Sequence, residues 1–470
     1  MKKLFQLFVP AILLAGCATG PDYIKRDPPA PAAWSNTAGT VSRTEDLSRW
    51  WQRLNDPLLT ELIEEALRNS PDMRSAQAKL RESRARIDLA DANRSPTVKG
   101  SLSGSKSKSG TSPASDLFKG GFDASWEPDI FGGQRRALEA ANADAGITLA
   151  NLHNTQVSLA AEVALNYVQL RSYQTRLAIA QSNLDSQRET LQITAWREQA
   201  GLVTTLDVEQ ARSSMYQTHA SIPTLNSSLT KAENRLAILL GKFPVALHER
   251  LSAPGTLPTL PDEIALAIPA DTLRQRPDVQ AAERKLAAET ARIGQAAASR
   301  YPSFSLSGSL GWQAATLGTL GAAESITSSL TGSIAQTIFD GGRVRSNIKA
   351  QNAVQEQAQI AYEKAVLTAL EDVENSLAAY ANSRERQAAL QLAATSARNA
   401  AQLAGQRYAS GLIDFPGVLD TERTRLSNED NLASTELDEL SAFISLYKAM
   451  GGGWEKSTEA TTNKTEGGHP

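Results

Sequence analysis

The chain has 470 residues and contains few side chains that could carry covalent or metal chemistry. It has one cysteine, Cys17, and its four histidines are scattered without the spacing of a metal site. Clusters of thiolate ligands and internal disulfides are therefore excluded, and a histidine metal site or a hydrolytic triad would have to be built from very little. The glycine pairs at 132–133 and 341–342 lack the lysine and hydroxyl residue of a phosphate-binding loop. The sequence predicts neither an enzyme nor a bound cofactor or metal ion.

Cys17 stands at the end of a segment typical of a secretory signal, with a basic start and a short, mainly apolar run that cannot anchor a membrane helix. Leu14-Ala15-Gly16-Cys17 resembles the bacterial lipobox, in which the thiol receives a diacylglyceryl group and cleavage leaves that cysteine as the N-terminus. We therefore expect a signal peptide over residues 1–16 and a covalent lipid on Cys17. An ordinary signal peptide with a chance cysteine is the alternative. Ala18 follows instead of Asp, which by resemblance to the sorting rules of Gram-negative cells favours the outer membrane.

Composition limits the class of protein further. The formal net charge of -3 argues against a protein built around nucleic-acid phosphate, so no nucleic-acid partner is expected. The mean hydropathy is -0.31, and no apolar run has the length that a membrane-spanning helix needs. Membrane-spanning strands are not excluded, because such strands are short and only alternately apolar. The length by itself favours about three domains.

The sequence repeats itself, and this decides the domain organisation. The dipeptide Pro71-Asp72 opens a segment that recurs from Pro277-Asp278, and further matches follow in the same order at a nearly constant separation. The later matches are 101–105 with 305–309, 130–133 with 338–342, and 200–203 with 410–413. Repeats of this kind indicate one fold made of two tandem halves, which replaces the estimate of three domains.

Each half begins with an amphipathic helix that is ended by a proline and followed by two strands. The strand segments alternate large apolar residues with Ser, Gly and Thr, which is the period-two pattern of a sheet with one apolar face. Such a face packs on a core in a globular hairpin or contacts lipid in a membrane-spanning strand, and this pattern leaves both open. The helices are expected at about 72–94 and 278–300, and the hairpin strands at about 97–127 and 303–338.

A long helical stretch without proline follows each pair of strands. Roughly 65 residues would reach on the order of 100 Å. Two apolar stripes run along the first stretch, so that it can pack against a neighbour on each side. Gly201 and Gly411 end the two stretches, and a second helix returns from each. Long helical hairpins are therefore expected at about 134–240 and 343–449, either as solvated coiled coils or as parts of a closed ring.

The remaining segments have mixed composition, and proline-rich residues among them are expected to wrap on the helices. The polar tail is predicted to be disordered. The resulting scheme is a signal peptide (1–16), a lipid anchor and extended segment (17–60), a first structural repeat (61–270) that ends in an equatorial segment (241–270), a second structural repeat (271–454) and a tail (455–470).

Four strands per chain are too few to close a barrel, since about eight are needed even for a filled interior. An open sheet with lipid-facing residues would leave unpaired edges in hydrocarbon, so other copies must close it. Two copies would give eight strands and a plugged pore, whereas three would give twelve strands and an open one. We favour three copies, which would also join their helices into one cylinder.

Five motifs recur in a known family: Gly20-Pro21-Asp22-Tyr23 after Cys17, the two Pro-Asp helix starts, residues 126–132, residues 338–342, and Gly411 with Val418-Leu419-Asp420. Together they resemble the TolC/OprM outer-membrane factor family, in its lipoprotein (NodT-type) branch. The resemblance implies an internally duplicated α+β membrane protein and a TolC-like homotrimeric channel, with four β-strands per protomer in a twelve-stranded barrel and long antiparallel helices in a periplasmic α-barrel. It also implies a passive exit duct of a tripartite efflux system, with a periplasmic adaptor (membrane fusion protein) and an inner-membrane RND-type transporter as partners.

The resemblance places a gate at the periplasmic tips of the helices. The family has a tyrosine just before the tip glycine and two acids a turn apart just after it, and Tyr408 and Asp420 match the tyrosine and the second acid. Gly417 stands at the position of the first acid, so a gate that follows the family would have one carboxylate ring. Asp414 is predicted to belong to the gate with Tyr408 and Asp420, and it is also expected to cap the returning helix, with Pro416 in its first turn. A packing role for Tyr408, and a role for Asp420 as a first-turn acid that complements the helix dipole, are the alternatives.

Other functions are weighed against the exit duct. An exit tunnel for type I protein secretion would use the same architecture. A periplasmic adaptor lipoprotein normally has one helical hairpin, and a lipid-anchored enzyme lacks reactive residues here. The expected location is the outer membrane of a Gram-negative bacterium, with lipid anchor and barrel in the membrane and helices in the periplasm. The cargo is not readable, because a tunnel contacts its solutes in water.

Overall fold

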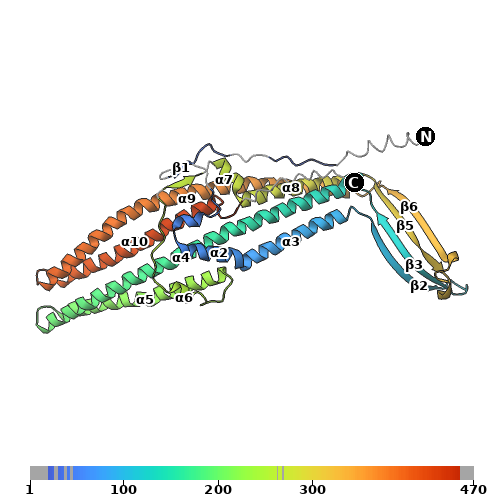
Figure 1. The fold of residues 1–470 in the computed structure, drawn as a ribbon. Helices are drawn as coiled ribbons and strands as arrows, with labels where there is room; N and C mark the ends of the chain where they lie inside the picture. The colour runs from blue at the N-terminus through green and yellow to red at the C-terminus, as the bar shows by residue number, and fades with distance from the viewer. Residues whose placement is uncertain are drawn as a thin grey trace, which may run out of the picture. The chain divides into compact units, whose positions relative to one another are not determined.

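The computed structural model describes residues 19–25, 30–35, 40–42, 46–261, 263–266 and 269–455. Cys17, the expected signal peptide and the tail after residue 455 lie outside the described residues. Long helices and a four-stranded sheet make up most of what is described (Figure 1). Among the described helices, none has the length and apolar character needed to cross a membrane.

The chain forms two compact units, and each of them draws on both sequence halves. The strand unit contains Ala78–Ala150 and Asp278–Ala365 together with the N-terminal residues up to Asp27. The hairpin unit contains Pro28–Gln77, Asn151–Pro277 and Val366–Pro470. The compact units therefore cut across the two repeats that the sequence suggests, because each repeat supplies its strands and the first part of its long helix to one unit and the rest of its helical hairpin to the other.

Two helices of equal length precede the strands in the sequence. Helices α3 (Pro71–Ala92) and α8 (Pro277–Ala298) both begin at the Pro-Asp dipeptide, in which proline suits the first helical position and the acid complements the helix dipole. Each helix ends shortly before a second proline, as expected. The described strands are β2 (Thr97–Ser107), β3 (Ser115–Trp126), β5 (Ser303–Ala314) and β6 (Ile326–Ala335), with the short 3-10 helices η2 (Leu317–Thr319) and η3 (Ala323–Ser325) between the last two.

The four strands form one antiparallel sheet in the order β2-β3-β5-β6, as Figure 1 shows. The central pairing joins β3 of the first half to β5 of the second, with Phe122 opposite Leu310. Strand β6 ends at Ala335, three residues before the expected limit. Strands β2 and β6 are the edges of this sheet within the described chain.

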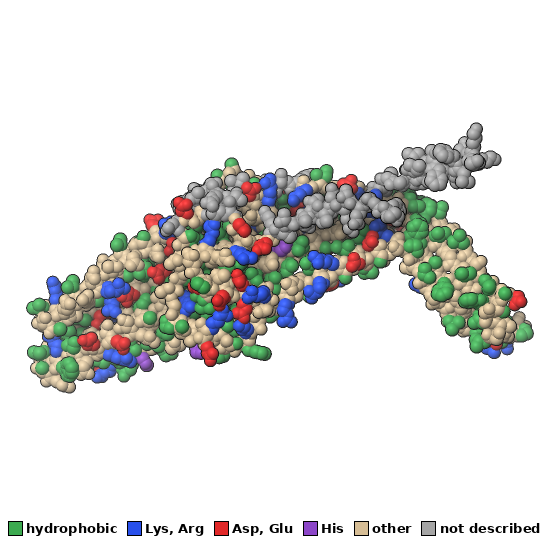
Figure 2. All heavy atoms as spheres, in the orientation of Figure 1, with side chains coloured by type: hydrophobic (Ala, Val, Ile, Leu, Met, Phe, Trp, Pro, Cys, Tyr) green, Lys and Arg blue, Asp and Glu red, His purple; other side chains and the backbone are tan. Residues whose placement is uncertain are grey.

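The sheet has one apolar and one polar face, as the alternation in the sequence predicts. On the apolar face large side chains lie opposite glycines across the strands, for example Phe122 opposite Gly100 and Leu102 opposite Gly120. On the polar face serine hydroxyls pair across strands, and Ser309 Oγ lies 2.8 Å from Ser329 Oγ. Every residue of β2 and β6 is exposed in the single chain. Figure 2 shows hydrophobic side chains gathered over the strands.

Two helical hairpins continue from the strands. The first consists of α4 (Gly133–Gln199) and α5 (Thr205–Leu239), and the second of α9 (Arg343–Ala409) and α10 (Phe415–Ala449). The long helices both have 67 residues and the returning helices both have 35, so the two hairpins match residue for residue.

The main core of the hairpin unit lies where its helices meet the segments before and between the hairpins. Trp50 stacks on Tyr447 with ring centroids 5.6 Å apart, and both side chains are fully buried. The short elements around this core are η1 (Trp50–Leu54), α2 (Pro57–Asn69), α6 (His248–Leu251), α7 (Pro269–Gln275), and the parallel pair of β1 (Thr40–Ser42) with β4 (Ile264–Leu266). The equatorial segment therefore contains both helix and strand.

Candidate functional site

The predicted gate tyrosine lies in a small apolar cluster at the tip of the second hairpin. Tyr408, near the end of α9, is 2% exposed and contacts Phe415 at the start of α10, with ring centroids 6.0 Å apart. Ala211 of α5 belongs to the same cluster, and two residues of α4 make polar contacts with the tyrosine. The Tyr408 hydroxyl bonds Thr194 Oγ1 at 3.1 Å, and the guanidinium of Arg197 lies 4.4 Å from the ring centroid. Arg197 also donates to the backbone carbonyl of Tyr408.

Local sequence explains why these groups meet. Thr194 and Arg197 are three residues apart on α4, so both side chains lie on one helix face. Gly411 has a φ of 74°, which lets the chain leave α9 in a left-handed conformation, and the N–H of Leu412 bonds the carbonyl of Arg407 at 2.8 Å. Tyr408 thus joins three helices of the hairpin unit.

No hydrogen bond joins the predicted gate acids to Tyr408 in the described structure. Asp414 occupies the N-cap position of α10, with extended backbone, yet its side chain makes no capping hydrogen bond. Pro416 lies in the first turn of α10, as expected. Asp420 is exposed and makes no hydrogen bond or ion pair with any residue that the structure describes. Gly417 lies between them and carries no charge.

A second arrangement lies in the strand unit, where residues 19–25, here called the N-terminal strap, contact α4 and α8. The backbone N–H of Thr19 bonds the carbonyl of Phe131 at 3.2 Å. The Arg136 side chain, 5% exposed, donates to the carbonyl of Thr19 at 3.1 Å and to a carboxylate oxygen of Asp22 at 2.6 Å. Tyr23 donates to Glu283 at 2.8 Å. Burial and the carboxylate of Glu283 raise the pKa of the Tyr23 phenol well above its usual range.

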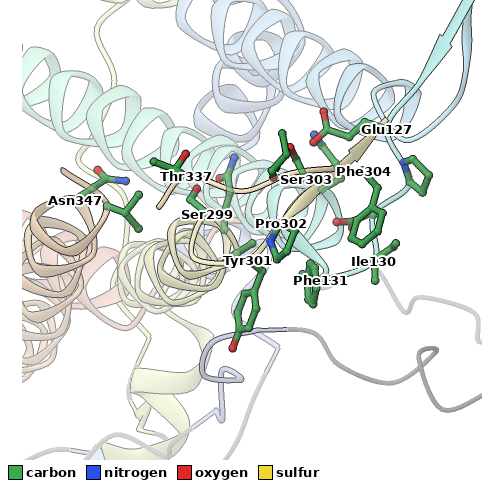
Figure 3. Close-up of a pocket in the computed structure, with 18 of the residues that line it drawn as sticks. Glu127, Ile130, Phe131, Ser299, Tyr301, Pro302, Ser303, Phe304, Thr337 and Asn347 are labelled. Atoms are coloured by element: carbon green, nitrogen blue, oxygen red, sulfur yellow. Dashed lines mark hydrogen bonds between the residues drawn. The ribbon is translucent and has the colours of Figure 1, made fainter. Parts of the chain in front are cut away.

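Phe131 also lines a cavity of about 700 Å³ at the junction of strands and helices. Its ring stacks on Tyr301 with centroids 4.6 Å apart. Figure 3 shows Phe131, Tyr301 and Ile130 grouped together, with Ser299, Thr337 and Asn347 at another side of the cavity. The cavity therefore has both aromatic and polar walls. Among the described residues, no group of three or more His, Cys, Asp or Glu could hold a metal ion.

Comparison with known proteins shows which family the chain belongs to. The model of a family described as outer membrane efflux protein matches residues 62–242 and 268–452, which is most of the chain. The chain belongs to the outer membrane efflux protein family.

Relatives of this outer membrane efflux protein match over nearly their whole lengths. It is 30% identical to nodulation protein T of Rhizobium leguminosarum bv. trifolii, covering 96% of this chain and 97% of that one. It is also 30% identical to the pyoverdine export outer membrane protein OpmQ of Pseudomonas aeruginosa, covering 99% of each. Among solved structures, the outer-membrane channel OprN superimposes with a TM-score of 0.87 at 38% identity, over 93% of this chain and all of that one.

The efflux protein therefore has the TolC-like channel fold and acts in efflux at the outer membrane, as predicted. The MtrE outer membrane channel of Neisseria gonorrhoeae, with a TM-score of 0.82 at 28% identity, shares the fold. These matches place the chain in a family of outer-membrane channels and transport ducts.

Two arginines of the efflux protein were not singled out by the sequence. Arg197 precedes Gly201 by four residues, just as Arg407 precedes Gly411, and this match is the signal that could have located it. Its contact with Tyr408 could not be found in this way, because the two residues are far apart in the sequence. The sequence signal for Arg136 was weaker. The Gly-Pro-Asp-Tyr motif contains an acid, Asp22, which needs a cationic partner, but the motif does not say which residue that partner is.

Proposed function

We propose that three copies of this chain form one passive exit duct of a tripartite efflux system, joined to a periplasmic adaptor and an inner-membrane RND-type transporter. The observation that carries the proposal is the match to OprN, which spans all of that outer-membrane channel with a TM-score of 0.87. The geometry of the sheet and of the helical hairpins supports the number of copies and their mode of contact.

The edges of the sheet favour assembly. Strands β2 and β6 each have a neighbour on one side only within the described chain, and their apolar side chains are exposed. In hydrocarbon an unpaired edge costs several kcal/mol for each unsatisfied backbone group. Pairing of β6 with β2 of another copy removes both edges. Three copies then supply twelve strands, which leaves an open interior, whereas eight strands enclose one that side chains fill.

Exposed apolar side chains on α9 support the same assembly. Ile360, Leu367 and Leu392 are 58%, 67% and 73% exposed in the single chain. A row of large apolar side chains along a soluble helix marks a contact surface. In the proposed trimer, this surface of one copy packs on the helical hairpin of the next, and the helices close into a cylinder.

The N-terminal strap supports a lipid anchor on Cys17. Thr19 is fixed to the carbonyl of Phe131, and two residues of chain reach at most about 7 Å. A lipid on Cys17 would therefore enter the membrane close to the junction of strands and helices. Mature acyl chains contribute about 0.8 kcal/mol per buried CH₂, so several chains would make attachment effectively permanent.

The gate of the proposed duct is the tip of the second hairpin. Tyr408 would hold α9 against α4, whereas Asp420 and Asp414, both exposed, would present their carboxylates to the mouth. Three copies of Asp420 close to the axis would attract cations. We expect Asp420→Ala to increase single-channel conductance in planar bilayers and to reduce cation preference. Unchanged conductance and ion selectivity would count against the carboxylate ring.

The assembly itself is tested by gel mobility without heating. Outer-membrane fractions should contain a band of three chains that resists SDS and collapses to one chain on heating. Substitution of Cys17 by Ser should remove labelling by radioactive palmitate. A monomer extracted without detergent from the periplasm would contradict the proposed duct.

A further inference from the structure

A cavity in the hairpin unit is lined by residues other than those of the tips. It has a volume of about 610 Å³ and lies between Thr175 of α4, three residues of α9, three residues of α10 and the segment 256–261. The residues of the two later helices are Tyr380, Arg384 and Gln387 of α9, and Glu436, Glu439 and Leu440 of α10. Its walls combine charged, aromatic and aliphatic side chains.

Two side chains of this cavity are buried without a polar partner. Glu439 is 6% exposed and Tyr380 is 3% exposed. Within the described residues, neither the carboxylate nor the phenol makes a hydrogen bond or an ion pair. Both side chains line the cavity, so a ligand that enters it would supply the polar partner that each of them lacks.

Other buried carboxylates of the hairpin unit do have partners, which makes Glu439 unusual. Glu429 accepts from Arg398 Nε at 3.0 Å, and Glu233 lies 3.0 Å from His248 Nδ1. The groups that face Glu439 are Glu436 on its own helix and Arg384 and Tyr380 on α9, while the cavity-lining residues of α4 and of 256–261 carry no charge. Burial raises the pKa of Glu439, the Glu436 carboxylate adds to this rise, and Arg384 opposes it.

The aliphatic part of the cavity comes from the segment 256–261. Leu257, Pro258 and Leu260 are at least partly buried, and the two leucines pack against the main core. The chain just before this segment is held on α4, because Arg171 donates to the carbonyl of Ala253 at 2.9 Å. The apolar wall is thus fixed in place before any ligand arrives.

We propose that this cavity binds an amphiphilic organic cation, namely an alkyl group that carries a primary ammonium. The ammonium has three donors, which suit the carboxylates of Glu436 and Glu439 and the hydroxyl of Tyr380. Glu436 and Glu439 are three residues apart on α10 and so face the same side. The alkyl chain lies along Leu257, Leu260 and Leu440. The cavity has two carboxylates and one guanidinium, that of Arg384, so its charge disfavours an anion. This site is independent of the proposed duct, because it uses one hairpin unit alone.

The test is calorimetric titration of the purified full chain in detergent solution with n-hexylammonium, using n-hexanol as the neutral probe of the same length. Wild type should bind the ammonium and should bind hexanol much more weakly. Glu439→Gln removes the charge and keeps the shape, and it should weaken hexylammonium binding about tenfold to a hundredfold, since charged hydrogen bonds are worth about 1.5–3 kcal/mol. Tyr380→Phe should have a smaller effect in the same direction.

Asp438→Asn is the matched control, because Asp438 lies on the same helix, is half exposed and pairs with Arg386 outside the cavity. It should leave the affinity unchanged. Acidic buffer should weaken binding to wild type as the carboxylates become protonated. Equal binding of hexanol and hexylammonium, or an unchanged affinity of Glu439→Gln, would overturn the proposal. So would a Glu439→Gln variant that loses only its trimer band in unheated gels, because the cavity would then serve contact between copies.

Discussion

The two hairpin tips have the same backbone but are held by different forces. In both, the tip glycine has a positive φ, 72° at Gly201 and 74° at Gly411. In both, the next N–H bonds the carbonyl of an arginine at 2.8 Å, Leu202 to Arg197 and Leu412 to Arg407. The repeat in the sequence therefore extends to the hydrogen bonds of the turn.

The difference lies in the caps and the neighbours. Thr204 and Asp207 form a reciprocal capping box at the start of α5. At the second tip Asp414 makes no capping bond, and Tyr408 instead contacts Thr194 and Arg197 of the other hairpin. The start of α5 thus has a cap of its own, whereas the second tip depends on the position of α4. A movement between the hairpins would break the contacts of Tyr408 with α4 and leave the capping box of α5 intact, which is what a gate requires.

The largest expected difference comes from Tyr408→Ala against Glu198→Ala. Both residues stand three positions before a tip glycine. Loss of the buried Tyr408 ring should cost about 3–5 kcal/mol of local stability, speed amide hydrogen exchange at the ends of α9 and α10, and raise channel conductance. Glu198 is partly exposed and accepts one bond from Thr205, so its loss should change little. Equal effects of both substitutions would contradict the contrast between the tips.

A smaller difference is expected for Arg197→Ala against Arg407→Ala. Arg197 lies on the Tyr408 ring and donates to its carbonyl, whereas Arg407 is exposed. The first substitution should cost about 1–3 kcal/mol of local stability from the lost cation–π contact and charged hydrogen bond. Combining Arg197→Ala with Tyr408→Ala should cost less than the sum of the single effects, as measured by hydrogen exchange at α9. Strict additivity would show that the two side chains do not act together.

The sequence predicts the frame of these tips but not their contacts. Helix lengths follow from uninterrupted periodicity and from Gly201 and Gly411, and the strands follow from alternation. The position of Tyr408 follows from the resemblance. Its burial against Thr194 and Arg197 does not, because that contact depends on how two long helices align after hundreds of residues of intervening chain. The missing capping bond of Asp414 could not be predicted either. An aspartate at this position predicts a bond that the side chain does not make.

A third and smaller difference between the tips is expected from the N-caps of α5 and α10. Thr204→Ala removes a bond that the structure shows, and it should cost about 0.5–2 kcal/mol at the start of α5. Asp414→Ala removes no capping bond and should cost close to nothing at the start of α10. Hydrogen exchange of the first turns of the two helices measures both effects. A comparable loss at Asp414 would mean that its side chain caps α10 in solution.

The smallest expected effect is a pH dependence of the contact between α4 of the first hairpin and α10 of the second. Glu422 of α10 accepts from Thr190 Oγ1 of α4 at 2.7 Å, and burial raises the pKa of its carboxyl, while Thr190 and Arg425 oppose the rise. A carboxyl with a raised pKa binds its proton more tightly in the folded state. Stability of the contact between α4 and α10 should therefore fall as pH rises from the usual Glu pKa through the raised one, and it should be greatest at acidic pH.

Glu422→Gln should be more stable than wild type above the raised pKa, and it should lose this part of the pH dependence. Glu209→Gln is the matched control on α5, because Glu209 is exposed and pairs with Arg212 on its own helix. Thermal unfolding midpoints across the acidic range measure both variants, and the difference from wild type removes contributions of other raised carboxyls such as Glu436 and Glu439. If Glu422→Gln keeps the full slope of wild type, protonation at this position does not couple the hairpins, and the second tip depends on Tyr408 and Arg197 alone.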